Sequence, residues 1–121
     1  MDYINTHAPG SVEGDLEEWA SLREVFGANL PACSSVKGLT GHALGASAAQ
    51  EAVYCLLMMQ EGFAAGCANL ANADPLMGEE ALLRRSMPMA MRAALSTTFG
   101  FGGTYSALVL RCGMAAAQTP L

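Results

Sequence analysis

Short apolar runs that suit β-strands alternate with longer segments of helical spacing, and this alternation constrains the fold more than any other feature of the chain. Residues 1–6 and 31–36 are strand candidates, the second built from small side chains. Residues 15–27 carry apolar side chains at helical spacing, and residues 45–60 are Ala-rich and apolar nearly all round. A helix apolar on every side is typical of a buried position. Strands alternating with helices predict an α/β fold.

The helix expected at residues 15–27 also shows signals at both ends. Glu18 follows Asp15 by three positions, which predicts a capping box. Gly27 stands where the apolar spacing stops, and glycine commonly follows the end of a helix. The sequence therefore predicts an amphipathic helix that begins near Asp15.

The C-terminal part predicts a β-hairpin. Two strand candidates, residues 89–98 and 105–112, are joined by the glycine-rich run 99–104. Between the central helix and this hairpin, residues 62–86 contain many turn-forming residues and predict a loop-rich crossover, with a possible helical turn at 79–85.

Size and charge limit the class of protein. With 121 residues the chain predicts one domain, which we place at residues 1–113, followed by an unstructured tail at 114–121. Only 14% of the residues are charged and 52% are hydrophobic, a balance that predicts apolar surface covered by missing neighbours. The net charge is −5 and no basic run occurs, which argues against a nucleic-acid-binding protein.

Neither a membrane span nor a disulfide framework is expected. The longest apolar stretch, residues 52–59, is too short to cross a bilayer, and no secretory leader opens the chain, so we expect a cytoplasmic protein. The cysteines form no C-x-x-C pair and predict reduced thiols without a zinc site, a metal or another cofactor; they are Cys33, Cys55, Cys67 and Cys112.

The two histidines of the chain both follow a predicted strand and precede a predicted helix. His7 lies in the run 5–9, and His42 lies in the glycine-framed run 37–45. A histidine by itself is more often a structural or surface residue, but histidine is also the side chain that exchanges protons most readily near neutral pH. Two of them on connecting turns beside small residues favour a catalytic site. The glycines at 100–103 either form a simple turn or let backbone amides approach a ligand, as an oxyanion hole requires.

Together these motifs resemble the C-terminal part of an elongating beta-ketoacyl-ACP synthase, of the thiolase superfamily. The runs that carry the resemblance are 5–7, 14–15, 37–45, 50–51 and 99–104, and the resemblance extends over residues 1–111. It implies an incomplete C-terminal half of a thiolase-like fold, with a mixed sheet and a buried central helix. The first strand and helix of that half are expected to be missing.

The resemblance also implies roles for particular residues. His7 and His42 match the two histidines of a Cys-His-His triad, which hydrogen-bond the malonyl thioester carbonyl. Lys37 matches the lysine that orders the site, and Glu51 matches its partner in a charged network. The amide of Phe101 matches part of the oxyanion hole, and its ring matches a gate to the acyl pocket.

Further positions follow from the same resemblance. Asn5 belongs to the structural network, and the substrate-binding positions are Ser11, Gly102, Gly103 and Thr104. Two residues depart from the family pattern. Pro9 replaces the first hydroxyl that meets the pantetheine arm, and Tyr105 stands where a small polar residue is common.

The implied activity is the decarboxylative Claisen condensation of malonyl-ACP with an acyl chain, in fatty acid or polyketide biosynthesis. The expected partners are acyl carrier protein, an N-terminal half that carries the nucleophilic cysteine, and a second subunit in a homodimer or heterodimer. Without that cysteine the chain alone is expected to be inactive. Two other hypotheses stay open: a non-catalytic partner like the chain-length factors, and a truncated gene product without independent activity.

Overall fold

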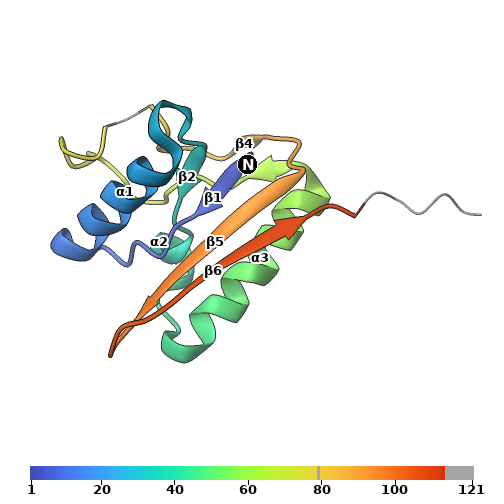
Figure 1. Ribbon diagram of the computed structural model, residues 1–121. Coiled ribbons are helices and arrows are strands. Elements are labelled where there is room, and N and C mark those ends of the chain that lie inside the picture. The colour runs from blue at the N-terminus through green and yellow to red at the C-terminus, as the bar shows by residue number, and fades with distance from the viewer. Residues whose placement is uncertain (79, 114–121) are drawn as a thin grey trace, which may run out of the picture.

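A mixed four-stranded sheet in the order β2-β1-β5-β6 forms the centre of the computed structural model, which describes residues 1–78 and 80–113. Its strands are β1 (Tyr3–Asn5), β2 (Ala32–Ser34), β5 (Ala93–Gly100) and β6 (Thr104–Arg111). β1 pairs in parallel with both β2 and β5, whereas β6 runs antiparallel to β5 at the edge of the sheet (Figure 1). The predicted α/β class and mixed sheet are confirmed.

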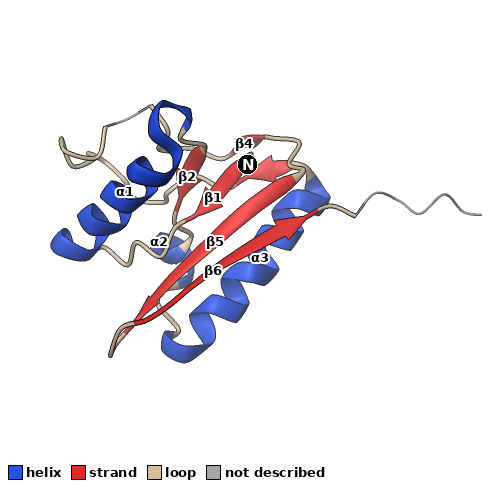
Figure 2. Cartoon of the chain, in the orientation of Figure 1, coloured by secondary structure: helices blue, strands red, loops and turns tan. Residues whose placement is uncertain are grey.

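Two long helices cover opposite faces of this sheet (Figure 2). α1 (Val12–Phe26) packs through Trp19 and Leu22 against Ile4 and Leu95. α3 (Ser47–Glu61) packs on the other face, where Cys55 and Met58 contact Tyr3 and Ala94. Because neighbouring residues of a strand point to opposite faces, the pairs Tyr3/Ile4 and Ala94/Leu95 each serve both cores.

Shorter elements complete the chain. The 3-10 helix η1 (Gly27–Asn29) follows α1, while α2 (Lys37–Thr40) and η2 (Leu44–Ala46) lie between β2 and α3. β3 (Phe63–Ala64) and β4 (Met87–Pro88) form a small antiparallel sheet of their own.

The N-terminus of α1 differs from the predicted one. The helix begins at Val12 with Ser11 as its N-cap, so Asp15 lies inside the first turn. The Asp15 carboxylate accepts the backbone N–H groups of Gly10 and Ser11, and Glu18 binds the loop after β1 instead of its own helix end. The expected capping box of Asp15 and Glu18 is therefore wrong.

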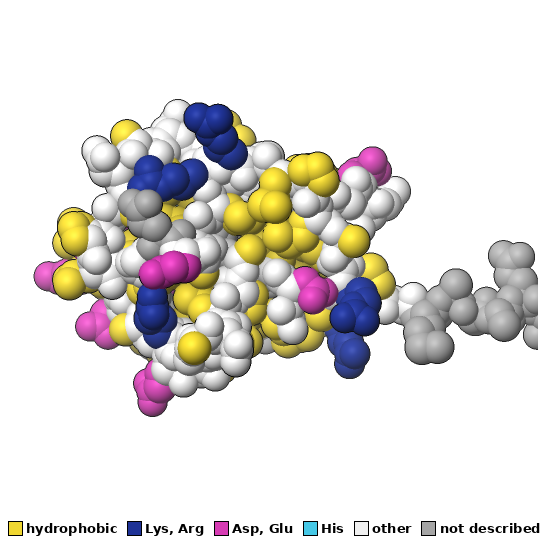
Figure 3. Space-filling view, turned by 90° about the horizontal axis from the view of Figure 1, so that it is seen from above, with side chains coloured by type: hydrophobic (Ala, Val, Ile, Leu, Met, Phe, Trp, Pro, Cys, Tyr) yellow, Lys and Arg dark blue, Asp and Glu magenta, His cyan; other side chains and the backbone are white. Residues whose placement is uncertain are grey.

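α3 is buried on one face only. Its buried residues follow a single stripe of Ser47, Glu51, Cys55 and Met58. On the other side, Val53, Leu56 and Leu57 are 52%, 51% and 49% exposed. The expected burial on all sides is absent because the described residues place the sheet against one side of the helix. Apolar side chains are also open to solvent in the view from above (Figure 3).

The crossover and the start of β5 bring two further corrections. Residues 80–85 form no helical turn, and residue 79 lies outside the described residues. Leu82 instead forms an isolated parallel bridge with Cys33 of β2, whose N–H donates to Ala81 O and whose carbonyl oxygen accepts from Leu83 N–H. β5 begins at Ala93 rather than at residue 89, because Met87–Pro88 pair with β3 and Met89 N–H donates to Gly62 O. The hairpin itself is confirmed, with residues 101–103 as its turn.

Among residues 1–78 and 80–113, no helix combines the length and the apolar character needed to cross a membrane. The predicted tail, residues 114–121, lies outside the described residues.

Candidate functional site

The two histidines meet beyond the carboxyl ends of β1 and β2. His7 comes two residues after β1, and His42 follows the short helix α2 rather than a strand directly. β1 and β2 are adjacent and parallel, so their carboxyl ends share one edge of the sheet. The two imidazole ring centroids lie 5.2 Å apart with the rings at 82°, an edge-to-face arrangement. The fold thus brings together two residues that are 35 positions apart in the sequence.

Hydrogen bonds hold the His42 ring in one orientation. Its Nδ1 accepts the backbone N–H of Leu44 at 3.1 Å and lies 2.9 Å from Ser47 Oγ. Leu44 has a φ of 52°, a left-handed conformation that is rare for leucine, so a strained turn presents this N–H to the ring. Because Nδ1 accepts, neutral His42 carries its proton on Nε2, which is therefore a donor.

His7 is held differently and stays neutral. Its pKa is lowered to about 4, chiefly because burial disfavours the charged form. The positive charges of Lys37 and His42 lower it further, because they repel a positive charge on the His7 ring. Within the part of the chain that the structure describes, Nδ1 of His7 is buried without a hydrogen-bond partner. Its side chain is thus an uncharged imidazole at neutral pH whose orientation depends on packing.

A buried polar network lies behind the histidines. Lys37 and Glu51 form an ion pair in which both side chains are almost fully buried, at 4% and 3% exposure. The other Glu51 oxygen, Oε2, accepts from Asn5 Nδ2 at 3.1 Å, and the same amide donates to Ser96 Oγ at 3.4 Å. Three residues singled out from the sequence, Asn5, Lys37 and Glu51, are in contact in the structure.

Glu18 is a residue of the site that the sequence reasoning missed. Its carboxylate accepts the backbone N–H groups of His7 at 2.9 Å and Ala8 at 2.8 Å, and the hydroxyl of Thr97 at 2.6 Å. Burial raises the pKa of Glu18, and these hydrogen bonds oppose the rise. The capping-box interpretation hid this role, although Glu18 adjoins the buried stripe of Trp19 and Leu22, which a helical wheel would have revealed.

The glycine hairpin places its two phenylalanines in different surroundings. Phe99 lies against His7, with ring centroids 5.9 Å apart, and Tyr105 lies against Phe99 at 5.2 Å. Phe101 stands at the tip of the turn and is fully exposed, beside Gly102 and Gly103, whose φ angles are 76° and 78°. The structure brings Phe99 rather than Phe101 into contact with a histidine.

The predicted substrate-binding positions are spread over two places. Ser11 is exposed at the N-cap of α1, and its backbone N–H donates to Asp15 Oδ1 at 3.2 Å. Gly102 and Gly103 form the turn of the hairpin, and Thr104 begins β6 opposite Gly100. Their roles toward a substrate stay predictions.

Three of the four cysteines are poor nucleophiles because they are partly or fully buried. Burial is the largest cause that raises the pKa of Cys33 and of Cys55, each to about 12, and it raises the pKa of Cys67 as well. Such thiols stay protonated at neutral pH, whereas the thiolate is the reactive form. Cys112 lies just beyond β6, and its S–H donates to Met91 O. Within residues 1–78 and 80–113, no group of three or more potential ligands is arranged to hold a metal ion.

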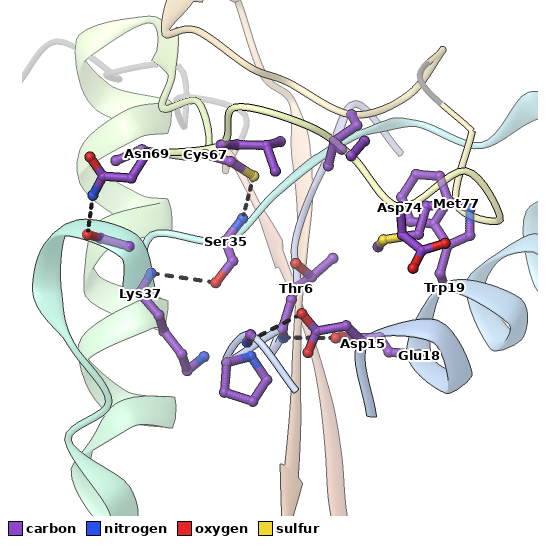
Figure 4. A pocket seen from close by; sticks show the side chains of 18 residues that line it. Thr6, Asp15, Glu18, Trp19, Ser35, Lys37, Cys67, Asn69, Asp74 and Met77 are labelled. Atoms are coloured by element: carbon purple, nitrogen blue, oxygen red, sulfur yellow. Dashed lines mark hydrogen bonds between the residues drawn. The ribbon is translucent and has the colours of Figure 1, made fainter. Parts of the chain in front are cut away.

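A cavity of about 270 Å³ adjoins the network on the α1 side (Figure 4). Lys37 reaches toward it from α2, Asp15, Glu18 and Trp19 line it from α1, and Cys67 lines it from the crossover. Burial is the largest effect on the Asp15 pKa and raises it. The cavity mixes acidic, basic and apolar groups directly behind the histidine loop.

Comparison with known proteins gives concordant matches. Residues 1–71 match the family described as "Beta-ketoacyl synthase, C-terminal domain". The 3-oxoacyl-[acyl-carrier-protein] synthase 1 of Escherichia coli (strain K12) is 40% identical over 111 residues, which are 92% of this chain and 27% of that protein.

Solved structures agree with the sequence matches. The ishigamide ketosynthase/chain length factor superposes with a TM-score of 0.89 and 27% identity, over 94% of this chain and 28% of that one. A type II polyketide ketosynthase in complex with its acyl-carrier protein superposes with a TM-score of 0.86 and 26% identity, over 93% and 28%. The chain thus spans about a quarter of the length of the curated relatives that it matches.

Proposed function

The chain belongs to the beta-ketoacyl synthase family, as part of its C-terminal domain, and we propose that it supplies the histidine half of a site for decarboxylative Claisen condensation. The observation that carries the proposal is the His7–His42 pair. One imidazole is fixed as an Nε2–H donor and the other is kept neutral, at a ring separation of 5.2 Å. Two neutral imidazole donors held side by side suit an oxygen that gains negative charge during a reaction.

The proposed donor substrate is a malonyl group on acyl carrier protein, and the proposed acceptor is an acyl chain held as a thioester. The relatives named 3-oxoacyl-[acyl-carrier-protein] synthase support this substrate class, and a similar ketosynthase was solved with its acyl-carrier protein. The activity would serve fatty acid or polyketide biosynthesis.

In the proposed reaction, the C–C bond to the malonyl carboxylate breaks and carbon dioxide leaves. The electron pair moves to the α-carbon and delocalises onto the thioester oxygen, which becomes an enolate. His7 and His42 donate hydrogen bonds to that oxygen and lower the energy of the enolate more than that of the neutral thioester. The α-carbon then attacks the carbonyl of the acyl thioester, and the acyl-bearing sulfur departs as a thiolate.

The buried Lys37–Glu51 pair sets the electrostatics of this site. The ammonium group of Lys37 lowers the pKa of His7, which helps to keep His7 an uncharged donor. Glu51 balances the lysine charge, since an unpaired ammonium at this depth would be strongly unfavourable. Asn5 anchors the second oxygen of Glu51 and so fixes the position of the pair.

The acyl-accepting cysteine must come from another part of the enzyme. We place it in an N-terminal half, on a separate or longer polypeptide, because the buried thiols of this chain are held protonated. The amide of Phe101 would complete the oxyanion hole for acyl transfer once that half covers the exposed hairpin tip. A homodimeric or heterodimeric enzyme is the proposed assembly.

The test is an acylation and condensation assay. The 121-residue chain should take up no label from radiolabelled acyl-ACP. The chain co-expressed with a cysteine-bearing N-terminal half should become acylated on that cysteine and release carbon dioxide from malonyl-ACP. Acylation of any cysteine of the chain alone would contradict the proposal. A complex that forms but neither takes up acyl groups nor releases carbon dioxide would favour the non-catalytic partner instead.

A further inference from the structure

The two histidine rings are held by different means, and the difference raises a question about His7. His42 is fixed through hydrogen bonds at Nδ1 with Leu44 and Ser47. Nδ1 of His7 has no such partner among the described residues, although it is buried. The orientation of His7 therefore depends on the rings that pack against it.

Four rings form a continuous series of edge-to-face contacts. The centroid distances are 5.2 Å from His42 to His7, 5.9 Å from His7 to Phe99, and 5.2 Å from Phe99 to Tyr105. The interplanar angles along the series are 82°, 66° and 63°. Centroid distances of this size with inclined rings are the preferred geometry of aromatic pairs.

The register of the hairpin explains why Tyr105 contacts Phe99. The two residues are direct cross-strand partners, and directly opposed residues of an antiparallel pair point to the same face. On the side of α1, Phe99 also borders an apolar groove of about 250 Å³ between Leu22, Phe26 and Ala107. Because that side is hollow, the ring of Phe99 has room to turn away from His7. Tyr105, although 68% exposed, is the aromatic contact that opposes such a movement.

We propose that Tyr105 is a positioning residue for His7, which it orients by holding the Phe99 ring against the imidazole. Its effect on catalysis rests on the proposed function, whereas its effect on the ring series does not. Tyr105 is also one of the two positions at which this sequence departs from the family pattern. The proposed positioning role therefore belongs to this sequence and does not follow from the glycine turn itself.

The test uses the full chain with labelled histidine side chains, whose two histidines give two sets of signals in an NMR titration. The charged or titratable groups around His7 are Lys37, His42 and Glu18, and none of them is altered. In Tyr105→Ala we expect the His7 pKa to rise from about 4 by about one unit toward its ordinary value, because water reaches the imidazole. Magnetisation transfer between the Phe99 and His7 rings should weaken at the same time.

Two variants serve as controls. Tyr105→Phe keeps the ring and should leave both the His7 pKa and the ring contact unchanged. Val109→Ala removes an exposed apolar side chain from the same face of β6, opposite Leu95, and should leave His7 unaffected. A complemented enzyme carrying Tyr105→Ala should lose at least several-fold in kcat for decarboxylation, with Tyr105→Phe restoring it.

An unchanged His7 pKa together with an unchanged Phe99–His7 contact in folded Tyr105→Ala would overturn the proposal. Should that variant not fold, the contact is measured in the parent chain, where its absence would overturn the proposal equally. A shifted His7 pKa in a complex that fails to decarboxylate would contradict the proposed function and leave the positioning role in place.

Discussion

Two regions of the molecule carry residues in surroundings that are usually unfavourable: buried polar side chains beside the sheet, and exposed apolar side chains on the outer face of α3. At the carboxyl ends of β1 and β2, a lysine, a glutamate and an asparagine are buried and contact one another. On α3, apolar side chains such as Leu56 and Leu57 are about half exposed, with nothing in the described residues covering them. The polar side chains thus find their main partners among the described residues, although Asn5 Oδ1 stays without one, whereas the apolar face of α3 has no cover there.

Breaking the polar network should have the largest effect on stability. Glu51→Ala leaves the Lys37 ammonium buried and unpaired, and we expect the free energy of unfolding to fall by about 3 to 5 kcal/mol in urea titrations. The exposed ion pair of Arg23 and Glu80 provides the control, since Glu80→Ala should cost less than about 1 kcal/mol. Equal losses in the two variants would show that the buried pair is not the stabilising element assumed here.

The second prediction compares the two sides of α3. Met58→Ala removes a side chain that is 2% exposed and should cost about 2 to 5 kcal/mol of unfolding free energy, because it leaves a cavity against the sheet. Leu56→Ala, two positions away on the exposed side, should cost less than about 1 kcal/mol. A large loss for Leu56→Ala in the isolated chain would mean that a second copy already covers this face.

The pH dependence of stability probes His7. Its folded pKa of about 4 lies below its ordinary value of 6.5, so the unfolded chain binds more protons between these values. The contribution of His7 to stability is therefore present above about pH 6.5 and is lost as the pH falls toward 4. Between pH 4 and 6.5, the urea midpoint of the parent should therefore fall more steeply with falling pH than that of His7→Gln. If the two midpoints changed with pH in parallel, the His7 imidazole would not be shielded from water as the lowered pKa requires.

The smallest expected effect concerns self-association. β6 is an edge strand whose outer side has no partner strand among the described residues, and Leu108 and Val109 on it are exposed; such edges pair with other chains. We expect the isolated chain to associate as its concentration rises, and Val109→Lys to reduce this association, as measured by sedimentation. A monomeric chain with a sharp unfolding transition at high temperature would contradict the view that its surface is unfinished.

Local patterns in the sequence predicted the elements that depend on local chemistry. The alternation of strand and helix runs located β1, α1, β2 and α3 to within a few residues, and the glycines at 100–103 located the hairpin. The family resemblance singled out Lys37, Glu51 and Asn5, and in the structure Glu51 contacts both Lys37 and Asn5. The helices, the strands and the hairpin could be predicted because periodicity and turn chemistry are properties of short segments.

Tertiary contacts decided what the sequence could not show. Glu18 has the spacing of a capping residue, but its role is set by backbone N–H groups 10 and 11 positions away. Phe99 lies within β5 and contacts His7, whereas Phe101 lies just beyond the end of that strand, in the turn of the hairpin. The start of β5 depends on the pairing of β4 with β3, which no local pattern records.

The most direct test of the account is malonyl-ACP decarboxylation by His42→Ala in an enzyme complemented with a cysteine-bearing half. His42 is held by Leu44 and Ser47 as an Nε2–H donor, so its loss removes one of two donors to the enolate oxygen. We predict a fall in the decarboxylation rate of about a hundred- to a thousand-fold. Acylation of the supplied cysteine should persist, because acyl transfer uses backbone amides. Decarboxylation at the parental rate would contradict the account and leave His42 a structural residue of its turn.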